Sequence, residues 1–150
     1  MKKLLLITAS ALLLAMVLYA CSASKGSEQK SPGEIANPIT GTWMLDSYKY
    51  QTSGAFIKPA QSSQHIKLIT DKMFMWSIHN PATRTTVESA GGAYVMNGDT
   101  CTEYIDFGYR MDSYIGTKAA YIVKVDGDFM FISGKLADGY IVEEVWKRIK

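Results

Sequence analysis

The sequence predicts an all-β fold, an eight-stranded antiparallel up-and-down barrel, and three observations support this prediction. Apolar and polar residues alternate over several short runs, the first of them Thr42 to Tyr50. Turn dipeptides such as Asn97-Gly98 and Asp126-Gly127 separate these runs. No stretch of about ten residues after residue 37 has a helical period. Eight short strands of this kind make a small barrel whose interior has room for a ligand or for side chains.

The expected strands and loops follow from this pattern. Two long loops interrupt the strands. The first, 51–63, is rich in Ser, Gln, Gly and Pro, and its apolar Phe56-Ile57 pair would either fold over a cavity or attach the loop to the surface. The second, 108–118, has room for one helical turn near Ser113-Tyr114-Ile115. The strands are expected at 42–50, 64–70, 73–79, 84–96, 99–107, 118–125, 128–133 and 140–149.

The N-terminus has the features of an export signal. Two lysines, Lys2 and Lys3, precede an apolar run from Leu4 to Val17, and Leu18-Tyr19-Ala20-Cys21 ends it. An uncleaved anchor is the alternative, but the run is short for crossing about 30 Å of hydrocarbon. The segment resembles a bacterial lipoprotein signal, which implies cleavage before Cys21 and lipid on its sulfur. Residues 1–20 are then the signal peptide, 21–37 a flexible tether, and 38–150 the barrel domain.

The charge of the processed chain is balanced. Lys2 and Lys3 are the only charged residues among the first twenty, so 14 acidic residues remain against the same number of basic ones. A neutral chain lacks the basic surface that phosphate binding requires, and we expect no nucleic-acid partner. The residue after Cys21 is Ser22 rather than Asp, which in bacterial lipoproteins implies export to the outer membrane. Whether the domain faces the periplasm or the outside stays open.

Turn positions predict which residues pair. A two-residue turn at Asp71-Lys72 would pair Ile69 with Phe74, Lys67 with Trp76 and His65 with Ile78.

A type I′ turn at Asn97-Gly98 would pair Met96 with Asp99, Tyr94 with Cys101 and Gly92 with Glu103, and Gly92 would leave room beside Glu103. The more apolar face of this hairpin is expected to point inward. It carries Tyr94, Met96, Cys101, Glu103, Ile105 and Phe107.

Several short motifs occur in a characteristic order. They are Gly41-x-Trp43, Asn97-Gly98-Asp99, Asp126-Gly127-Asp128 followed by Met130 and Ile132, and Trp146-x-Arg148. With these motifs the chain, from about residue 40 to 150, resembles bacterial lipocalin-like domains, in particular uncharacterised lipocalin-like lipoproteins of gut Gram-negative bacteria. The resemblance implies that Trp43 packs under Arg148 and that Trp43, Trp146 and Arg148 close the barrel. The fatty-acid-binding branch has an arginine where this chain has Glu144, so a fatty-acid ligand is not expected.

The candidate ligand-binding residues are Lys67, Phe74, Trp76, Tyr94, Glu103 and Glu144. Alternation along the last strand and the Trp-x-Arg match turn Glu144 inward and Glu143 outward. Two inward carboxylates, Glu103 and Glu144, have three interpretations. They would form a general acid–base pair, be neutralised by Lys67 or His65, or, if the registers are wrong, face water.

No pattern indicates an enzyme or a cofactor. The two histidines, His65 and His79, do not make a cluster of metal ligands, and the chain has no nucleophile elbow or glycine-rich phosphate loop. We therefore expect no catalytic residues, no metal and no cofactor. The expected function is that of a membrane-anchored, lipocalin-like binding protein of the cell envelope for a small apolar or amphipathic ligand. The alternative is a filled barrel that binds another envelope protein. Oligomeric state is not readable.

Overall fold

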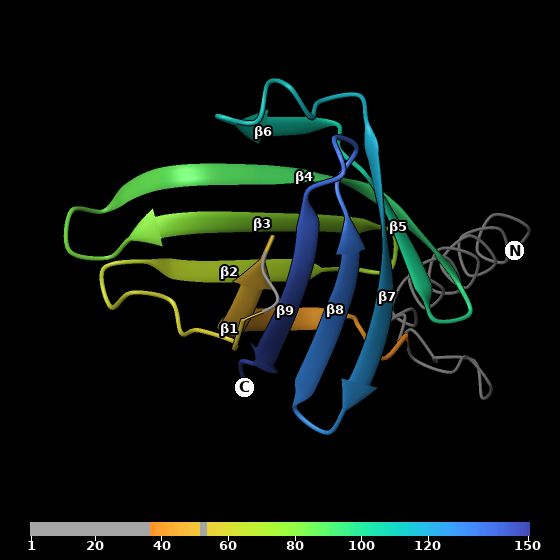
Figure 1. Cartoon of the computed structure of the whole chain (residues 1–150), viewed down its shortest axis with the longest axis horizontal. Helices are drawn as coiled ribbons and strands as arrows, with labels where there is room; N and C mark the ends of the chain where they lie inside the picture. The colour runs from red at the N-terminus through yellow and green to blue at the C-terminus, as the bar shows by residue number, and fades with distance from the viewer. Residues whose placement is uncertain (1–36, 52–53) are drawn as a thin grey trace, which may run out of the picture. The chain divides into compact units, whose positions relative to one another are not determined.

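The computed structural model describes residues 37–51 and 54–150 (Figure 1). The predicted signal peptide, the lipidation site Cys21 and nearly all of the predicted tether lie outside the described residues. Within those residues, no helix is long and apolar enough to cross a membrane.

The described residues form one closed antiparallel sheet. The strands run in the order β3-β2-β1-β9-β8-β7-β5-β4-β6, and pairing of β3 with β4 closes the ring. Strands β5 and β6 both pair with β4, at different points along it, so together they occupy one position and the barrel has eight. This confirms the predicted fold class. The strands are β1 (Gly41–Tyr50), β2 (Gln64–Ile69), β3 (Met73–Asn80), β4 (Thr85–Asn97), β5 (Thr100–Tyr104), β6 (Phe107–Tyr109), β7 (Lys118–Asp126), β8 (Phe129–Lys135) and β9 (Ile141–Arg148).

One predicted hairpin register is confirmed and another is wrong. The β2–β3 hairpin pairs Lys67 with Trp76 as predicted, with the two-residue turn at Asp71-Lys72. In the β4–β5 hairpin, Met96 pairs with Cys101, and Tyr94 with Glu103. The turn residues are Gly98 and Asp99, and only Gly98 has a positive φ, 62°. A glycine at the first central position is typical of a type II′ turn, not of the predicted type I′ turn. Because the shift is two residues, the inward face survives.

The alternation breaks where β5 ends. Asp106 N–H donates to the Gly91 carbonyl at 2.9 Å, which separates β5 from β6. As a result Phe107, predicted to point inward, is 46% exposed. The prediction that Gly92 lies opposite Glu103 is also wrong: Gly92 pairs with Phe74, and a Cβ there would overlap the carbonyl oxygen of Tyr104. Glycine at this point permits the close approach of β4 and β5.

A β-bulge in β1 changes which of its side chains face the interior. The pairing with β9 shifts register between Leu45 and Ser47, which resets the alternation. Strict alternation would place Tyr48 on the face opposite Trp43, but Tyr48 packs against the core, together with Tyr50.

One end of the barrel is closed by Trp43 and Arg148, as predicted. The Arg148 guanidinium carbon lies 4.0 Å from the centre of the Trp43 ring, and Trp43 has no exposed surface. Arg148 also donates to the carbonyls of Thr40 and Pro38, at 2.7 and 2.8 Å. Gly41 has a φ of 142°, and a Cβ there would lie 2.5 Å from an Arg148 nitrogen. The Gly-x-Trp motif therefore makes room for the cation over the indole.

Candidate functional site

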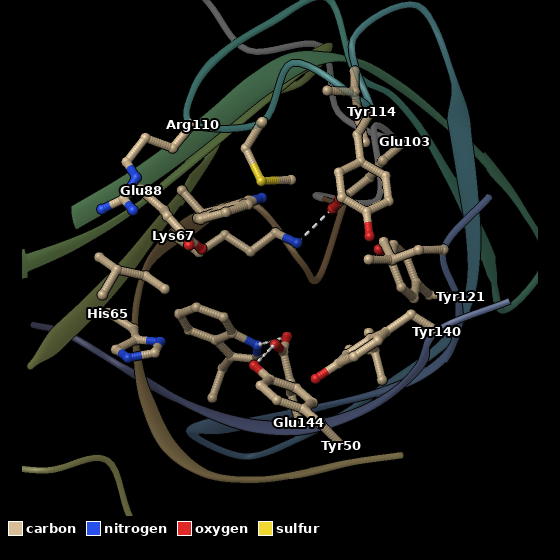
Figure 2. A pocket seen from close by; sticks show the side chains of 17 residues that line it. Tyr50, His65, Lys67, Glu88, Glu103, Arg110, Tyr114, Tyr121, Tyr140 and Glu144 are labelled. Carbon is tan, nitrogen blue, oxygen red and sulfur yellow. Dashed lines mark hydrogen bonds and ion pairs between the residues drawn. The ribbon is translucent and has the colours of Figure 1, made fainter. Parts of the chain in front are cut away.

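The barrel encloses a cavity of about 340 Å³ (Figure 2). This volume is within the range of small-molecule sites. Side chains from most strands reach it, and three connecting segments contribute the rest. From the strands come Tyr50, His65, Lys67, Trp76, Ile78, Glu88, Glu103, Tyr121, Val142, Glu144 and Trp146, and from the connecting segments come Ile105, Arg110, Met111, Tyr114, Leu136 and Tyr140.

The floor of the cavity holds a buried ion pair. Lys67 Nζ lies 2.5 Å from Glu103 Oε1, and both side chains are almost completely buried. Burial raises the pKa of Glu103, although the Lys67 charge opposes this. Burial alone would lower the pKa of Lys67, but the Glu103 and Glu144 carboxylates outweigh it and raise this pKa. Lys67 therefore stays protonated, and the pair supplies a polar floor of no net charge when Glu103 is ionised.

Aromatic rings surround the Lys67 ammonium. It lies 5.4 Å from the ring centre of Phe74, 5.9 Å from that of Tyr121 and 6.0 Å from that of Trp146. Cations within about 6 Å of a ring centre are attracted by the ring quadrupole. The barrel interior thus stabilises one ammonium group with a carboxylate and three rings.

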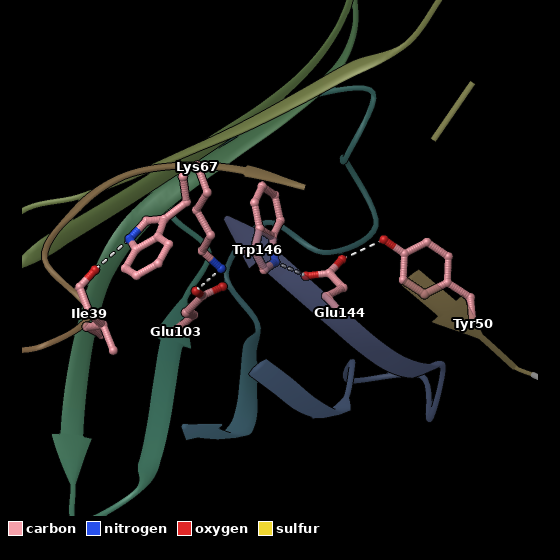
Figure 3. A network of polar contacts seen from close by, with 7 residues as sticks. Ile39, Tyr50, Lys67, Glu103, Glu144 and Trp146 are labelled. Atoms are coloured by element: carbon pink, nitrogen blue, oxygen red, sulfur yellow. Dashed lines mark hydrogen bonds and ion pairs between the residues drawn. The ribbon is translucent and has the colours of Figure 1, made fainter. Parts of the chain in front are cut away.

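Glu144 forms a second polar centre in the cavity (Figure 3). The Tyr50 hydroxyl donates to its Oε1 at 2.5 Å, and Trp146 Nε1 donates to its Oε2 at 2.8 Å. Burial first, and then the neighbouring Glu144, raises the pKa of Tyr50, so the phenol remains a donor. The neighbouring Glu143 instead forms an ion pair with Lys49 at 2.7 Å, as its predicted outward position requires.

The loop 110–117 reaches over the mouth of the cavity. Its Met111 is 8% exposed, and its Tyr114 lines the cavity. The Tyr114 hydroxyl donates to Asp138 Oδ2 at 2.6 Å, which links this loop to the β8–β9 turn. The loop begins at Arg110, which has a φ of 59°. The Ile115 N–H donates to the Met111 carbonyl at 3.3 Å, so a single turn with an i→i+4 hydrogen bond lies where one helical turn was predicted, and it does not continue as a helix.

The described part of the loop 51–63 does not line the cavity. Ile57 forms both backbone hydrogen bonds with Tyr48 at 2.9 Å, on an edge of β1 that β2 leaves unpaired. Phe56 lies under the Lys49 ammonium at 5.2 Å and is 44% exposed. Of the two interpretations of this apolar pair, attachment to the surface is the one observed.

Further aromatic side chains lie near the mouth. The ring centres of Tyr50 and Tyr140 are 5.8 Å apart, and those of Tyr48 and Tyr50 are 4.6 Å apart. His65 lies beside them, with its ring centre 6.4 Å from that of Tyr48. Burial, and then the nearby His79, lowers the pKa of His65, so this imidazole is neutral at neutral pH.

Four of the six candidate ligand-binding residues line the cavity. They are Lys67, Trp76, Glu103 and Glu144.

The other two, Phe74 and Tyr94, are buried outside the lining. Tyr94 donates its hydroxyl to the Thr70 carbonyl at 2.7 Å and accepts from Asn37 at 2.9 Å, near the closed end. Trp146, expected at the closed end with Arg148, is a wall of the cavity.

Several lining residues were not among the predicted ones. Tyr121 alternates with Val123 on an inward face and was recognisable as such. Tyr50 depends on the β1 bulge, and Tyr114 and Tyr140 lie in loops, so alternation carries no signal for them. These three residues are all tyrosines that lie in a loop or at the end of a strand beside one.

Of the three interpretations of the paired carboxylates, neutralisation by Lys67 fits Glu103 but not Glu144. Glu103 pairs with Lys67, and Glu144 accepts from two neutral donors. No group of three or more potential metal ligands occurs among the described residues. Cys101 is buried, and burial raises the pKa of its thiol to about 11. An unreactive thiol is expected from such a value.

The fold is similar to that of two solved Bacteroides proteins. One is a lipocalin-like protein from Bacteroides uniformis, with a TM-score of 0.52 and 15% identity over 75% of this chain and 99% of that one. The other is described as an uncharacterized protein from Bacteroides eggerthii, with a TM-score of 0.51 and 12% identity over 73% and 98%. The chain therefore has the fold of a lipocalin-like β-barrel. At these identities the likeness shows the fold alone. No protein-family model and no curated protein matches the sequence.

Proposed function

We propose that this lipocalin-like barrel binds a small, amphipathic molecule in its cavity. The observation that carries the proposal is a cavity of about 340 Å³ whose walls are aromatic and whose floor holds the Lys67–Glu103 pair and Glu144. Ligand sites combine apolar walls with a few converging polar groups in this way. The apolar part of the ligand would contact the rings, and its polar part would reach the carboxylates.

The alternative, a filled barrel that binds another envelope protein, has weaker support. Apolar side chains do lie on the outer surface: Leu68 and Met75 face each other across β2 and β3 and are 41% and 42% exposed. Exposed apolar patches mark interaction surfaces when they are large. The cavity, however, has no purpose in a barrel that works by its outer surface alone, and this favours ligand binding.

Native mass spectrometry of the protein purified from its own host tests the proposal. A retained small molecule is the expected result. A matched pair of variants on β9 links binding to the cavity. Val142→Phe adds a ring inside the cavity, whereas Val145→Phe adds the same ring on the opposite face of the same strand. A neutral fluorescent probe such as N-phenyl-1-naphthylamine should bind Val145→Phe like wild type and bind folded Val142→Phe weakly. Equal binding by the two variants would locate the probe outside the barrel.

The proposal includes attachment to the outer membrane through a lipid on Cys21. Its support is the sequence alone: the apolar run, Ala20 and the following Ser22. Metabolic labelling with a fatty-acid probe in the host should label the wild-type protein but not Cys21→Ala. Label on the alanine variant would contradict lipidation at Cys21.

A further inference from the structure

The charges that line the inner cavity do not cancel. Lys67 and Glu103 neutralise each other at 2.5 Å. Glu88 and Arg110 also line the cavity, and their formal charges cancel. Glu144 is then the carboxylate in excess, and among the described residues no cation lies within ion-pair distance of it. His65 is neutral because burial lowers its pKa. The inner cavity therefore carries an excess negative charge at Glu144, in an environment where solvent screening is weak.

The hydrogen bonds of Glu144 come from neutral groups and leave room for another partner. Both donors, the Tyr50 hydroxyl and Trp146 Nε1, are neutral. A carboxylate has about four lone-pair sites, and these two bonds use one on each oxygen. Figure 2 shows Glu144 beside Tyr50, and the Tyr140 ring lies next to that of Tyr50. Glu144 thus presents a fixed, oriented and only partly satisfied anion to the cavity.

The Lys67 ammonium shows what a carboxylate surrounded by aromatic rings stabilises in this barrel. The Lys67 ammonium is held by one carboxylate, Glu103, and by the rings of Phe74, Tyr121 and Trp146. Glu144 repeats the pattern nearby. Its carboxylate is accompanied by the rings of Tyr50, Tyr140 and Trp146, all of which line the cavity. The difference is that the protein itself supplies the cation at Glu103, whereas it supplies none at Glu144.

We propose that the cavity selects ligands with a cationic head group, an amine or a quaternary ammonium, which lies against Glu144 among the rings of Tyr50, Tyr140 and Trp146. An ammonium group gains both from the carboxylate and from the ring faces. A carboxylate or sulfate head group is repelled by Glu144. It would also have to displace Glu103 to reach Lys67. This inference rests on the proposed ligand binding and specifies the class of the ligand.

Ligands with the same apolar chain and different head groups test the inference. Octyltrimethylammonium, 1-octanol and octanoate would each be titrated, below their aggregation concentrations, against the wild-type protein loaded with the neutral naphthylamine probe. We expect octyltrimethylammonium to displace the probe at least ten times more effectively than octanoate, with 1-octanol between them. This comparison needs no variant, so it does not depend on the folding of one.

Two variants then assign the preference to one carboxylate. Glu144→Gln removes the charge while its amide oxygen can still accept from Tyr50 or Trp146, and it should abolish most of the preference for the ammonium. Glu143→Gln, one residue away and paired outward with Lys49, should keep it. Thermal unfolding of each variant checks that it is folded.

The outcomes separate this inference from the proposed function. If the three octyl compounds displace the probe equally, or octanoate does so best, the cationic preference is wrong while ligand binding stands. The same holds if Glu143→Gln and Glu144→Gln have equal effects. If neither the probe nor any octyl compound binds, the proposed function fails and this inference fails with it.

Discussion

The buried Lys67–Glu103 pair can be tested by a double-mutant cycle. Lys67→Met leaves Glu103 buried without a partner, and Glu103→Leu leaves the ammonium without its nearest carboxylate. Removing one member of a buried pair typically costs about 3–5 kcal/mol, whereas replacing both with apolar residues is often neutral. We expect each single variant to lose stability in this range. The double variant Lys67→Met/Glu103→Leu should stay within about 1 kcal/mol of wild type.

Additive losses would total about 6–10 kcal/mol, comparable to the whole stability of a small domain. Urea unfolding of the four proteins measures the difference. The pH adds an independent check. A lone buried carboxyl has a raised pKa, so the folded Lys67→Met variant binds a proton more readily than its unfolded chain, and its stability falls as pH rises through that pKa. Lys67→Met should therefore lose less stability at pH 5 than at pH 8. Additivity in the cycle, or a single variant as stable as wild type, would refute the reasoning.

Three further predictions follow from other parts of the molecule. Trp43→Ala should lower the free energy of unfolding by about 3–5 kcal/mol because Trp43 is fully buried. Gly41→Ala should also destabilise the fold because its Cβ would meet Arg148. A wild-type urea midpoint for Trp43→Ala would contradict this. The pKa of His65 is lowered by folding, so the unfolded chain binds more protons and stability falls as pH drops below about 6.5. In His65→Gln, unfolding at a series of pH values should show a smaller loss, and an unchanged loss would assign it to other groups. Tyr114→Phe removes the hydrogen bond to Asp138 across the mouth of the cavity, so stopped-flow mixing should show faster release of the bound probe with little change in stability. An unchanged release rate would mean that this hydrogen bond does not limit the exit of the probe.

The polar residues of the site were predictable because they lie in regular strands. Lys67 follows from the Asp71-Lys72 turn, and Glu144 from alternation along the last strand together with the Trp-x-Arg match. Glu103 was placed inward in spite of a wrong pairing partner, because a two-residue slip preserves the face. An error of two residues in the register therefore leaves the predicted inward face correct but makes the predicted pairing partner wrong.

The aromatic part of the site was less predictable because irregular backbone positions it. The bulge after Leu45 turns Tyr48 and Tyr50 inward, and the break between β5 and β6 turns Phe107 outward. Both irregularities depend on pairing with another strand, β9 at the far end of the chain in the first case and β4 in the second. A period-two pattern contains no information about where an extra residue is inserted.

The position of the ion pair also bears on why the cavity has a charged floor. At the closed end, Trp43 and Arg148 fill the interior, and apolar packing there stabilises the fold. Lys67 and Glu103 lie where the cavity begins, and an apolar pair of similar volume would be at least as stable. Stability therefore does not explain a charged floor. Binding does, because a polar group of a ligand that reaches this depth needs polar partners. The double variant Lys67→Met/Glu103→Leu should accordingly remain folded and yet bind amphipathic ligands less tightly than wild type.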